Sequence, residues 1–209
     1  MPAKLFLLSP ATLNGLRAKQ LMSLRAKFAL ATQYRSEEGV EIGDAFAFMS
    51  ALYFRGKIAY ARRFAVPSPL VGSGIFVITP GYGLVPADWR ITEERMKRMR
   101  KIDVDVSTRN YVKPLRDHAQ LIAQALDRDG DTEAQVVLLG SVATGKYVDV
   151  LWPILGPRLR FPTAFAGLGD MARGGLMLRA AREGKELEYR TLEGDRKRPP
   201  GATGKMPKL

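Results

Sequence analysis

The sequence predicts a single α/β domain, with a mostly parallel or mixed sheet flanked by helices. Short apolar runs at residues 4–8, 75–79 and 135–139, and more loosely at 158–165, have the length and composition of buried strands. Segments with helical spacing of apolar residues separate these runs, as in βαβ units. The 209 residues are 46% hydrophobic and 26% charged, which is enough to build one core.

The elements follow from periodicity and from the residues that end each run. Strand segments end at Pro, Gly or Ser, whereas helical segments repeat apolar residues every three or four positions. The predicted elements are strand 4–8, helix 11–32, helix 44–64, strand 75–79, an exposed helix or ordered loop at 90–101, helix 115–126, strand 135–139, a short helix at 147–155, strand 158–165 and helix 171–182. We expect Pro153 to cut the short helix, Pro162 to place the last strand towards a sheet edge, and Gly184 to end the last helix.

Several polar residues have structural interpretations. Asp44 is expected to cap the second helix, Asp88 to lie in a turn, and His118 to be half-buried on the apolar side of its helix. The second helix also carries an apolar stripe made of Phe46, Met49, Tyr53, Tyr60 and Phe64.

The domain is expected to cover residues 1–189 and a basic, flexible tail residues 190–209. The tail holds six basic and two acidic residues, three prolines and three glycines.

Charge and composition indicate the partner and exclude several chemistries. The chain has 33 Lys and Arg against 21 Asp and Glu, a net charge of +12, and no acidic residue before Glu37. Such an excess favours a polyanionic partner, and DNA is our expectation. The absence of cysteine excludes disulfides, zinc–thiolate sites and thiol nucleophiles, and His118 is the single histidine. We therefore expect neither a metal nor a cofactor.

The amino terminus does not resemble a secretory signal. Only four apolar residues follow Lys4 before Ser9-Pro10, and no apolar run approaches the roughly 18 residues of a membrane span. A soluble, cytoplasmic monomer without membrane association is expected.

Small or turn-forming residues follow each predicted strand. They are Ser9-Pro10, Pro80-Gly81, Gly140-Ser141 and Gly167-Leu168-Gly169. In open α/β sheets ligands bind outside the carboxyl ends of the strands, so parallel strands would bring these loops to one site. Tyr82 lies between Gly81 and Gly83, which offer its ring little to pack against, so it is a candidate to stack on a base or to hydrogen-bond a phosphate.

The segment from Gly140 to Lys146 has the spacing of a phosphate-binding P-loop. Tyr147 follows where that motif requires the Ser or Thr hydroxyl that holds magnesium, so nucleotide hydrolysis is a minority interpretation. Backbone amides of the same loop, with Ser141, remain candidates to hold a phosphate or a base.

Asp170 is the most distinctive carboxylate. It follows a glycine-rich turn at a predicted helix start, with Arg173 and Arg179 soon after. A helix cap is the simpler interpretation, and a carboxylate at the mouth of a basic pocket is the functional one.

Five segments, in the same chain order, resemble the YaaA family, which is associated with the peroxide stress response. They are residues 7–13 (LLSPATL), 54–58 (FRGKI), 78–88 (ITPGYGLVPAD), 136–147 and 172–177 (ARGGLM). Asp170 and Met171 replace the lysines that precede "ARG" in that family, and its helix-hairpin-helix region is not evident. The resemblance implies a compact α/β fold with a basic, DNA-binding cleft, and it adds Arg55, Lys57 and Arg90 to the candidate site.

These expectations combine into one hypothesis, a DNA glycosylase that excises a damaged or modified base, for example from phage DNA in antiviral defence. Such an enzyme needs a base pocket, cations for phosphates and an acidic group, but no cysteine or metal. The catalytic candidates are Asp170 and Tyr82. The DNA- or base-binding candidates are Ser9, Arg55, Lys57, Gly81, Gly83, Arg90, Ser141, Lys146, Tyr147, Arg173 and Arg179. A non-enzymatic binder of unusual DNA structures and a P-loop-like nucleotide hydrolase are the alternatives.

Overall fold

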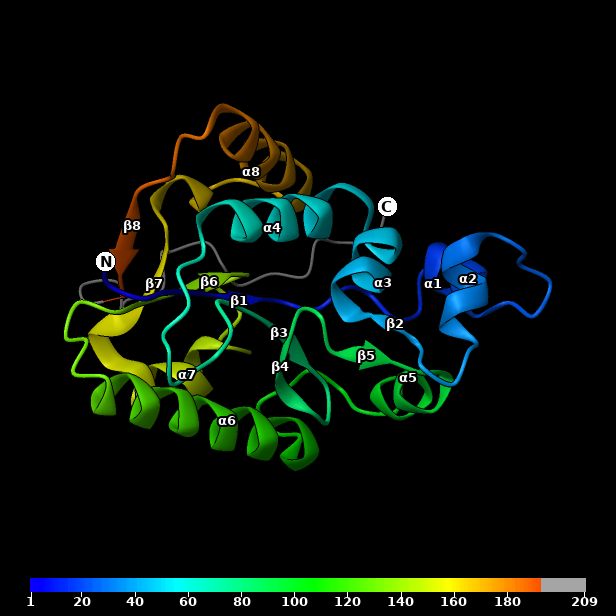
Figure 1. The fold of residues 1–209 in the computed structure, drawn as a ribbon, viewed down its shortest axis with the longest axis horizontal. Coiled ribbons are helices and arrows are strands. Elements are labelled where there is room, and N and C mark those ends of the chain that lie inside the picture. The colour runs from blue at the N-terminus through cyan, green and yellow to red at the C-terminus, as the bar shows by residue number, and fades with distance from the viewer. Residues whose placement is uncertain (193–209) are drawn as a thin grey trace, which may run out of the picture.

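Six strands form one mixed sheet in the order β4-β3-β1-β6-β7-β8 in the computed structural model, which describes residues 1–192 (Figure 1). The strands are β1 (Lys4–Leu8), β3 (Ile75–Thr79), β4 (Gly83–Pro86), β6 (Gln135–Leu139), β7 (Leu159–Pro162) and β8 (Tyr189–Thr191). A separate antiparallel pair joins β2 (Val40–Glu41) to β5 (Arg90–Ile91). The predicted fold class, an α/β domain with a mixed sheet flanked by helices, is confirmed.

The four central strands are parallel. β1 pairs with β3 and with β6, and β6 pairs with β7, all in parallel register. β4 and β8 close the two sides of the sheet as antiparallel strands. The carboxyl ends of β1, β3, β6 and β7 therefore share one edge of the sheet, as the functional interpretation of the loops required.

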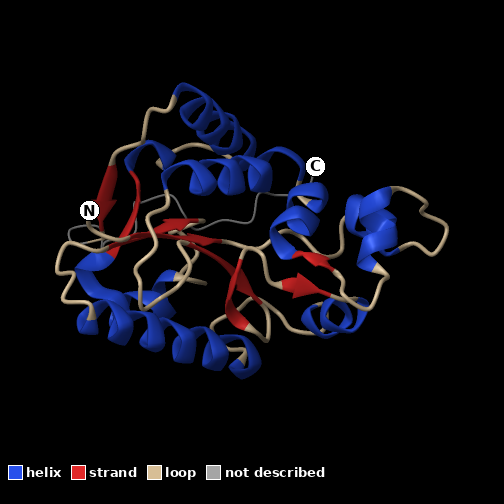
Figure 2. Ribbon diagram, in the orientation of Figure 1, coloured by secondary structure: helices blue, strands red, loops and turns tan. Residues whose placement is uncertain are grey.

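Helices cover both faces of the sheet (Figures 1 and 2). The bounds are α1 (Leu16–Met22), α2 (Ala29–Tyr34), α3 (Ile42–Met49), α4 (Ala51–Phe64), α5 (Glu93–Met99), α6 (Arg109–Arg128), α7 (Val148–Leu155) and α8 (Asp170–Glu183), with 3₁₀ turns at Gly156–Arg158 and Thr163–Phe165. α4 and α8 lie on one face, and α6 and α7 on the other. The buried residues form two hydrophobic cores. Side chains of β1 alternate between them, with Phe6 and Leu8 in one core and Leu5 and Leu7 in the other.

Two predicted helices are interrupted. The segment 11–32 forms α1 and α2 instead of one helix, because Ser23 adopts an extended conformation at the end of α1. The Arg35 guanidinium donates to the carbonyls of Ser23 and Ala26, at 2.9 and 2.6 Å, and so stabilises the turn between the helices. The segment 44–64 likewise divides at Ser50 into α3 and α4.

The prolines act differently from the predictions. Pro153 lies inside α7, which continues to Leu155 and ends at Gly156 with φ 51°. Pro162 does not place β7 at an edge, because β8 pairs with β7 on its outer side. Pro162 is the last residue of the strand, and the amide of Thr163 supplies the next bond, 2.9 Å from the carbonyl oxygen of Glu188.

The end of the chain departs from the predicted domain boundary. β8 extends the sheet to Thr191, beyond the expected limit at residue 189, because it adds a strand to β7. The remainder of the predicted tail, residues 193–209, lies outside the described residues.

Within residues 1–192, no helix combines the length and apolar character needed to cross a membrane.

Gly184, by contrast, ends α8 as predicted. It adopts a left-handed conformation with φ 65°.

Candidate functional site at the carboxyl edge of the sheet

A cavity of about 280 Å³ opens at the carboxyl edge of the parallel strands. Pro10 follows β1, Pro80 follows β3, and Lys146 and Tyr147 belong to the loop after β6, so three of the four predicted loops meet here. The lining is completed by Ala11, Thr12, Leu13, Asn14, Met99, Arg100, Ile102, Asp103 and Val104. The loop at residues 167–169 does not line this cavity.

Lys57 and Ser9 form a buried pair behind the cavity. Lys57 is 1% exposed, and its Nζ lies 2.6 Å from Ser9 Oγ and 3.1 Å from the Ser9 carbonyl oxygen. The pair forms because Lys57 projects from α4, which packs over β1, and Ser9 directly follows that strand. Gly140 permits the arrangement, since a Cβ there would lie 3.0 Å from the Cβ of Ser9.

Burial lowers the pKa of Lys57 from 10.5 to about 7, because the charged amine loses its water. Asp170 opposes this shift and Arg173 adds to it. None of the ion pairs between described residues includes Lys57. A lysine that can be neutral near pH 7 is able to accept and donate a proton under physiological conditions.

Tyr147 connects the cavity to this pair. It lines the cavity and is 8% exposed, and Ser9 lies close enough to its hydroxyl to lower the pKa of Tyr147, against the larger effect of burial. Burial raises the pKa of Tyr147 to about 12, so the phenol keeps its proton at neutral pH.

Tyr53 lies on the other side of Lys57. Its ring centroid is 3.8 Å from Lys57 Nζ, a cation–π contact that favours the charged amine. The Tyr53 hydroxyl is buried without a hydrogen-bond partner among the described residues, and burial raises its pKa. Such an unsatisfied buried group is costly.

Two glycines bring Asp170 and Arg173 to this site. α4 and α8 cross so closely that a Cβ on Gly174 would lie 2.8 Å from the Leu52 carbonyl oxygen, and one on Gly56 would meet the backbone of Gly174. Arg173 is held by the Phe165 carbonyl oxygen, at 3.2 Å from Nε and 3.0 Å from Nη2. The crossing places both α8 charges near Tyr53 and Lys57, whose pKa values they influence.

Asp170 is the first residue of α8 and does not occupy the cap position. Gly169 is the N-cap, and it makes no side-chain cap bond. The carboxylate is exposed in the first turn, where the helix dipole favours a negative charge. The simple cap interpretation of Asp170 is therefore wrong.

Tyr82 is packed, contrary to the prediction. Its ring centroid lies 5.2 Å from that of Trp89, and the Arg98 guanidinium carbon lies 4.9 Å from the Tyr82 centroid. Arg95 stacks in the same way on Trp89, at 4.5 Å. These four residues form what we call the arginine–aromatic wall. It adjoins the cavity, because the next residues of the chain, Met99 and Arg100, line it.

The loop from Gly140 to Lys146 is not arranged around a phosphate. Asp149, in the first turn of α7, places its carboxylate directly against Gly145, where it would repel a phosphate. Lys146 is exposed at the cavity, and its carbonyl oxygen accepts a 3.0 Å bond from the Tyr111 hydroxyl. Ser141 follows Gly140 and is half-buried.

The glycines beside Tyr82 have separate roles. Gly81, with φ 83°, packs against Ile102 at the cavity. Gly83, with φ 70°, packs against the backbone of Pro114 and against His118. His118 is half-buried as predicted, with Nδ1 2.8 Å from the Leu84 carbonyl oxygen.

The remaining predicted residues lie outside this cluster. Arg90 is exposed and donates to the Gly39 carbonyl oxygen at 3.3 Å, and Arg55 and Arg179 are exposed on α4 and α8. Asp44 lies in the first turn of α3, not at its cap, and pairs with Arg62 at 3.3 Å. Asp88 lies in a turn, as expected.

Four residues of the site were not predicted. Asn14, Arg100 and Asp103 line the cavity, and the Arg100 side chain donates to Asn14 Oδ1 at 3.1 Å. Tyr53 was assigned only to an apolar stripe. Its position one helical turn before Lys57 is the sequence signal that could have placed it beside the amine.

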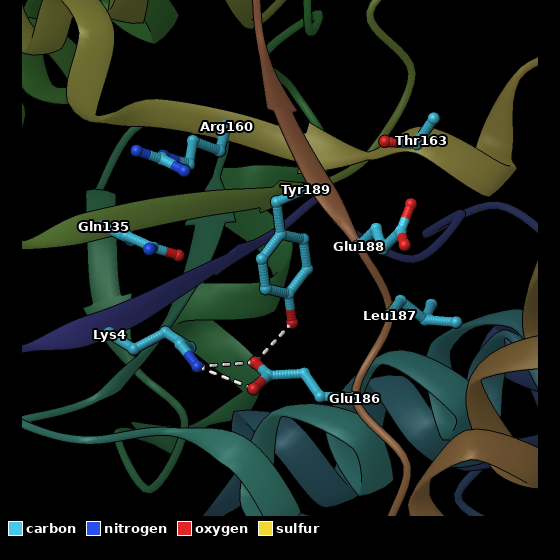
Figure 3. A pocket seen from close by; sticks show the side chains of 8 residues that line it. All are labelled: Lys4, Gln135, Arg160, Thr163, Glu186, Leu187, Glu188 and Tyr189. Carbon is cyan, nitrogen blue, oxygen red and sulfur yellow. Dashed lines mark hydrogen bonds and ion pairs between the residues drawn. The ribbon is translucent and has the colours of Figure 1, made fainter.

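A second cavity, of about 430 Å³, lies near the amino ends of β1 and β6 (Figure 3). Lys4 pairs with Glu186 at 2.7 Å, and the Tyr189 hydroxyl donates to the same carboxylate at 2.8 Å. This network ties β1 to the segment before β8, at the edge of the sheet opposite Ser9. Arg160 also lines this cavity, and its Nε is buried without a hydrogen-bond partner among the described residues.

Comparison with known proteins adds no assignment. No family model matches the chain, and neither a curated protein nor a solved structure is detectably similar to it.

Proposed function

We propose that the protein is a DNA glycosylase that hydrolyses the N-glycosidic bond of a damaged or modified base. The observation that carries the proposal is the convergence of Ser9, Lys57, Tyr147, Asp170 and Arg173 at the carboxyl edge of the sheet, next to a cavity. Clusters of ionisable groups with shifted pKa values are typical of active sites. The cavity volume of about 280 Å³ is close to the smallest volumes found for small-molecule binding pockets. Such a volume suits a single flipped base.

The groups of the site match the steps of such a reaction. The C1′–N bond breaks, the base leaves with the bonding electrons, and positive charge develops on the sugar. Asp170 stabilises that charge and orients the water whose oxygen bonds to C1′. The products are an abasic sugar and a free base that has gained a proton.

The arginine–aromatic wall supplies the DNA-binding surface of the proposal. Arg98 forms none of the ion pairs between described residues, and α5 presents it on Tyr82 next to the cavity. Stacking on an aromatic ring restricts the guanidinium, so less conformational freedom is lost when it contacts a phosphate. The chain's net charge of +12 favours the same partner.

A non-enzymatic DNA-binding protein is the second candidate. It is favoured by one observation, that Asp170 is not among the residues that line the 280 Å³ cavity. On this alternative the wall and cavity bind DNA, and the buried Lys57 has only a structural role.

Incubation of the protein with DNA decides between the two. Genomic DNA from several sources, including phage DNA with modified bases, is treated with the protein and assayed for abasic sites. The glycosylase proposal predicts abasic sites in at least one of these DNAs, with Asp170→Asn inactive on it. DNA binding without abasic sites in any of them supports the second candidate.

A further inference from the structure

The hydrogen-bond donors of Lys57 are fully used in its charged form. An ammonium group has three N–H bonds. Two point to Ser9, at Oγ and at the carbonyl oxygen, and the face of the Tyr53 ring accepts the third. The site therefore holds a protonated lysine without a carboxylate in contact with it.

Loss of one proton would reverse the bond between Lys57 and Ser9. A neutral amine has a lone pair, so Ser9 can donate its hydroxyl proton to Nζ. Ser9 Oγ is then free to accept from another donor. Tyr147, which lines the cavity together with Pro10 and whose pKa Ser9 lowers, is the neighbouring hydroxyl that could approach it. The Ser9 hydroxyl otherwise lies 3.3 Å from the Leu139 carbonyl oxygen, a weaker contact than the 2.6 Å bond to Lys57.

We propose that Tyr147, Ser9 and Lys57 form a proton relay that delivers a proton from the buried amine to the departing base in the cavity. The inference rests on the proposed glycosylase function, to which it adds the acid that protonates the leaving group. Tyr147 is the catalytic residue, because it faces the cavity, and Ser9 and Lys57 are positioning residues that act through it.

The proton movements balance in three transfers. The Tyr147 hydroxyl proton bonds to the nitrogen of the base as the C1′–N bond breaks. The Ser9 hydroxyl proton moves to the Tyr147 oxygen, and one Lys57 ammonium proton moves to Ser9 Oγ. Water then adds to C1′ and releases one proton, so the amine can be recharged with no net loss from the protein.

The surroundings allow Lys57 to perform this role. Tyr53 faces it from its own helix, Asp170 and Arg173 face it from α8, and Ser9 faces it from the end of β1. Asp170 favours the charged amine, Arg173 disfavours it, and burial disfavours it most. An amine with a pKa of about 7 gives up a proton far more readily than a surface lysine.

The relay makes a specific prediction about substrates. A neutral base is a poor leaving group unless it is protonated, whereas an N7-alkylated purine already carries a positive charge and leaves without an acid. Loss of the relay should therefore impair the release of neutral bases and spare that of cationic ones.

The test compares Lys57→Met, Ser9→Ala and Tyr147→Phe with wild type, and Tyr60→Phe serves as a control. Tyr60 is also a buried tyrosine, but its hydroxyl bonds to that of Tyr189, 2.6 Å away and outside the site. The substrates are duplex DNAs that carry hypoxanthine, which is neutral, or 7-methylguanine, which is cationic. We expect each of the three variants to release hypoxanthine about 100-fold more slowly than wild type and to release 7-methylguanine at nearly the wild-type rate. We expect Tyr60→Phe to release both bases at nearly the wild-type rate. An equal loss on both substrates would overturn the relay.

A second readout does not depend on catalysis. Lys57 is titrated by NMR of protein labelled with ¹³C at the lysine Cε, in wild type, Ser9→Ala and Tyr147→Phe, after melting curves show that each variant is folded. The relay predicts that both substitutions shift the Lys57 midpoint, because each removes a member of one hydrogen-bonded chain. A midpoint unchanged in both variants rejects the relay, even if wild type releases no base from either DNA and the glycosylase proposal itself has failed.

Discussion

The amine of Lys57 lies 2.6 Å from the hydroxyl of Ser9, inside the protein and at the carboxyl end of the central strand. The contact joins a helix on one face of the sheet to the edge where the parallel strands end. Burial in the folded protein lowers the pKa of Lys57 to about 7, so this amine can gain or lose a proton near neutral pH. It also makes the stability of the protein depend on pH in a defined direction.

Lys57→Met should remove a pH-dependent term from the free energy of unfolding. The folded pKa of about 7 lies below the unfolded value of 10.5, so between these pH values the unfolded chain binds more protons than the native one. Wild-type stability therefore gains from rising pH across this window, by at most about 1.4 kcal/mol per pH unit from this group. Urea unfolding at pH 7, 8 and 9 should show a steeper rise for wild type than for Lys57→Met, and parallel curves would contradict the assignment.

Gly174→Ala should separate α4 from α8. The new Cβ would lie within 3 Å of the Leu52 and Tyr53 backbone, which cannot move aside as a flexible side chain would. We expect a loss of about 1–3 kcal/mol in the free energy of unfolding. Gly175→Ala is the matched control in the same helix, because a Cβ there would have no described atom within 4 Å beyond its own stretch of helix, and it should stabilise by up to about 1 kcal/mol. Similar losses in both variants would show that helix composition, not the close crossing, is responsible.

The central sheet could be predicted from sequence because its strands are short apolar runs with clear ends. Residues 4–8, 75–79 and 135–139 form β1, β3 and β6 with the predicted bounds. β4 was missed although it forms a local hairpin with β3, because its short segment lies between Gly83 and Pro86. β8 was missed because its pairing with β7 is tertiary. Leu84 and Val85 look like part of a turn, and Tyr189 packs as a strand only because β7 offers a free edge. The break in helix 11–32 was hidden for the same reason, since Arg35 stabilises it from outside the segment.

The candidate site was predictable in its location and less so in its chemistry. Parallel strands with loops ending in small residues indicated the carboxyl edge, and the family resemblance added Lys57 to the candidates together with Arg55 and Arg90. Nothing in the sequence shows that the amine of Lys57 turns inward to Ser9, because its helix also exposes Arg55 and Arg62. The packing of Tyr82 against Trp89 and Arg98 depends on α5, which no local pattern could place beside the turn.

Arg98→Ala should weaken DNA binding. The plot of log K against log salt has a negative slope. If Arg98 contacts one phosphate, its removal makes that slope shallower by about 0.9. Arg128→Ala is the control, since Arg128 is also an exposed arginine but lies in the last turn of α6 and does not line the cavity. Binding isotherms at several salt concentrations measure both slopes. Equal effects of the two substitutions would show that net charge, not the arginine–aromatic wall, determines binding.

Deletion of residues 196–209 should weaken DNA binding without abolishing it. The segment carries five basic residues and no acidic one, so it adds nonspecific attraction to DNA. The proposed specific contacts lie at the cavity and the arginine–aromatic wall, and these remain. Complete loss of binding by a truncated protein with an unchanged melting temperature would assign the DNA site to the tail instead.

The most direct measurement is base release by Asp170→Asn, compared with wild type on the same modified DNA and quantified by mass spectrometry of the free base. Asp170 is exposed and is not the N-cap of α8, so the variant should melt within a few degrees of wild type. Loss of a negative charge near phosphate should leave DNA affinity level or raise it. We predict that base release falls by about 100-fold or more. Release at the wild-type rate by a folded Asp170→Asn protein would contradict the catalytic role of this carboxylate.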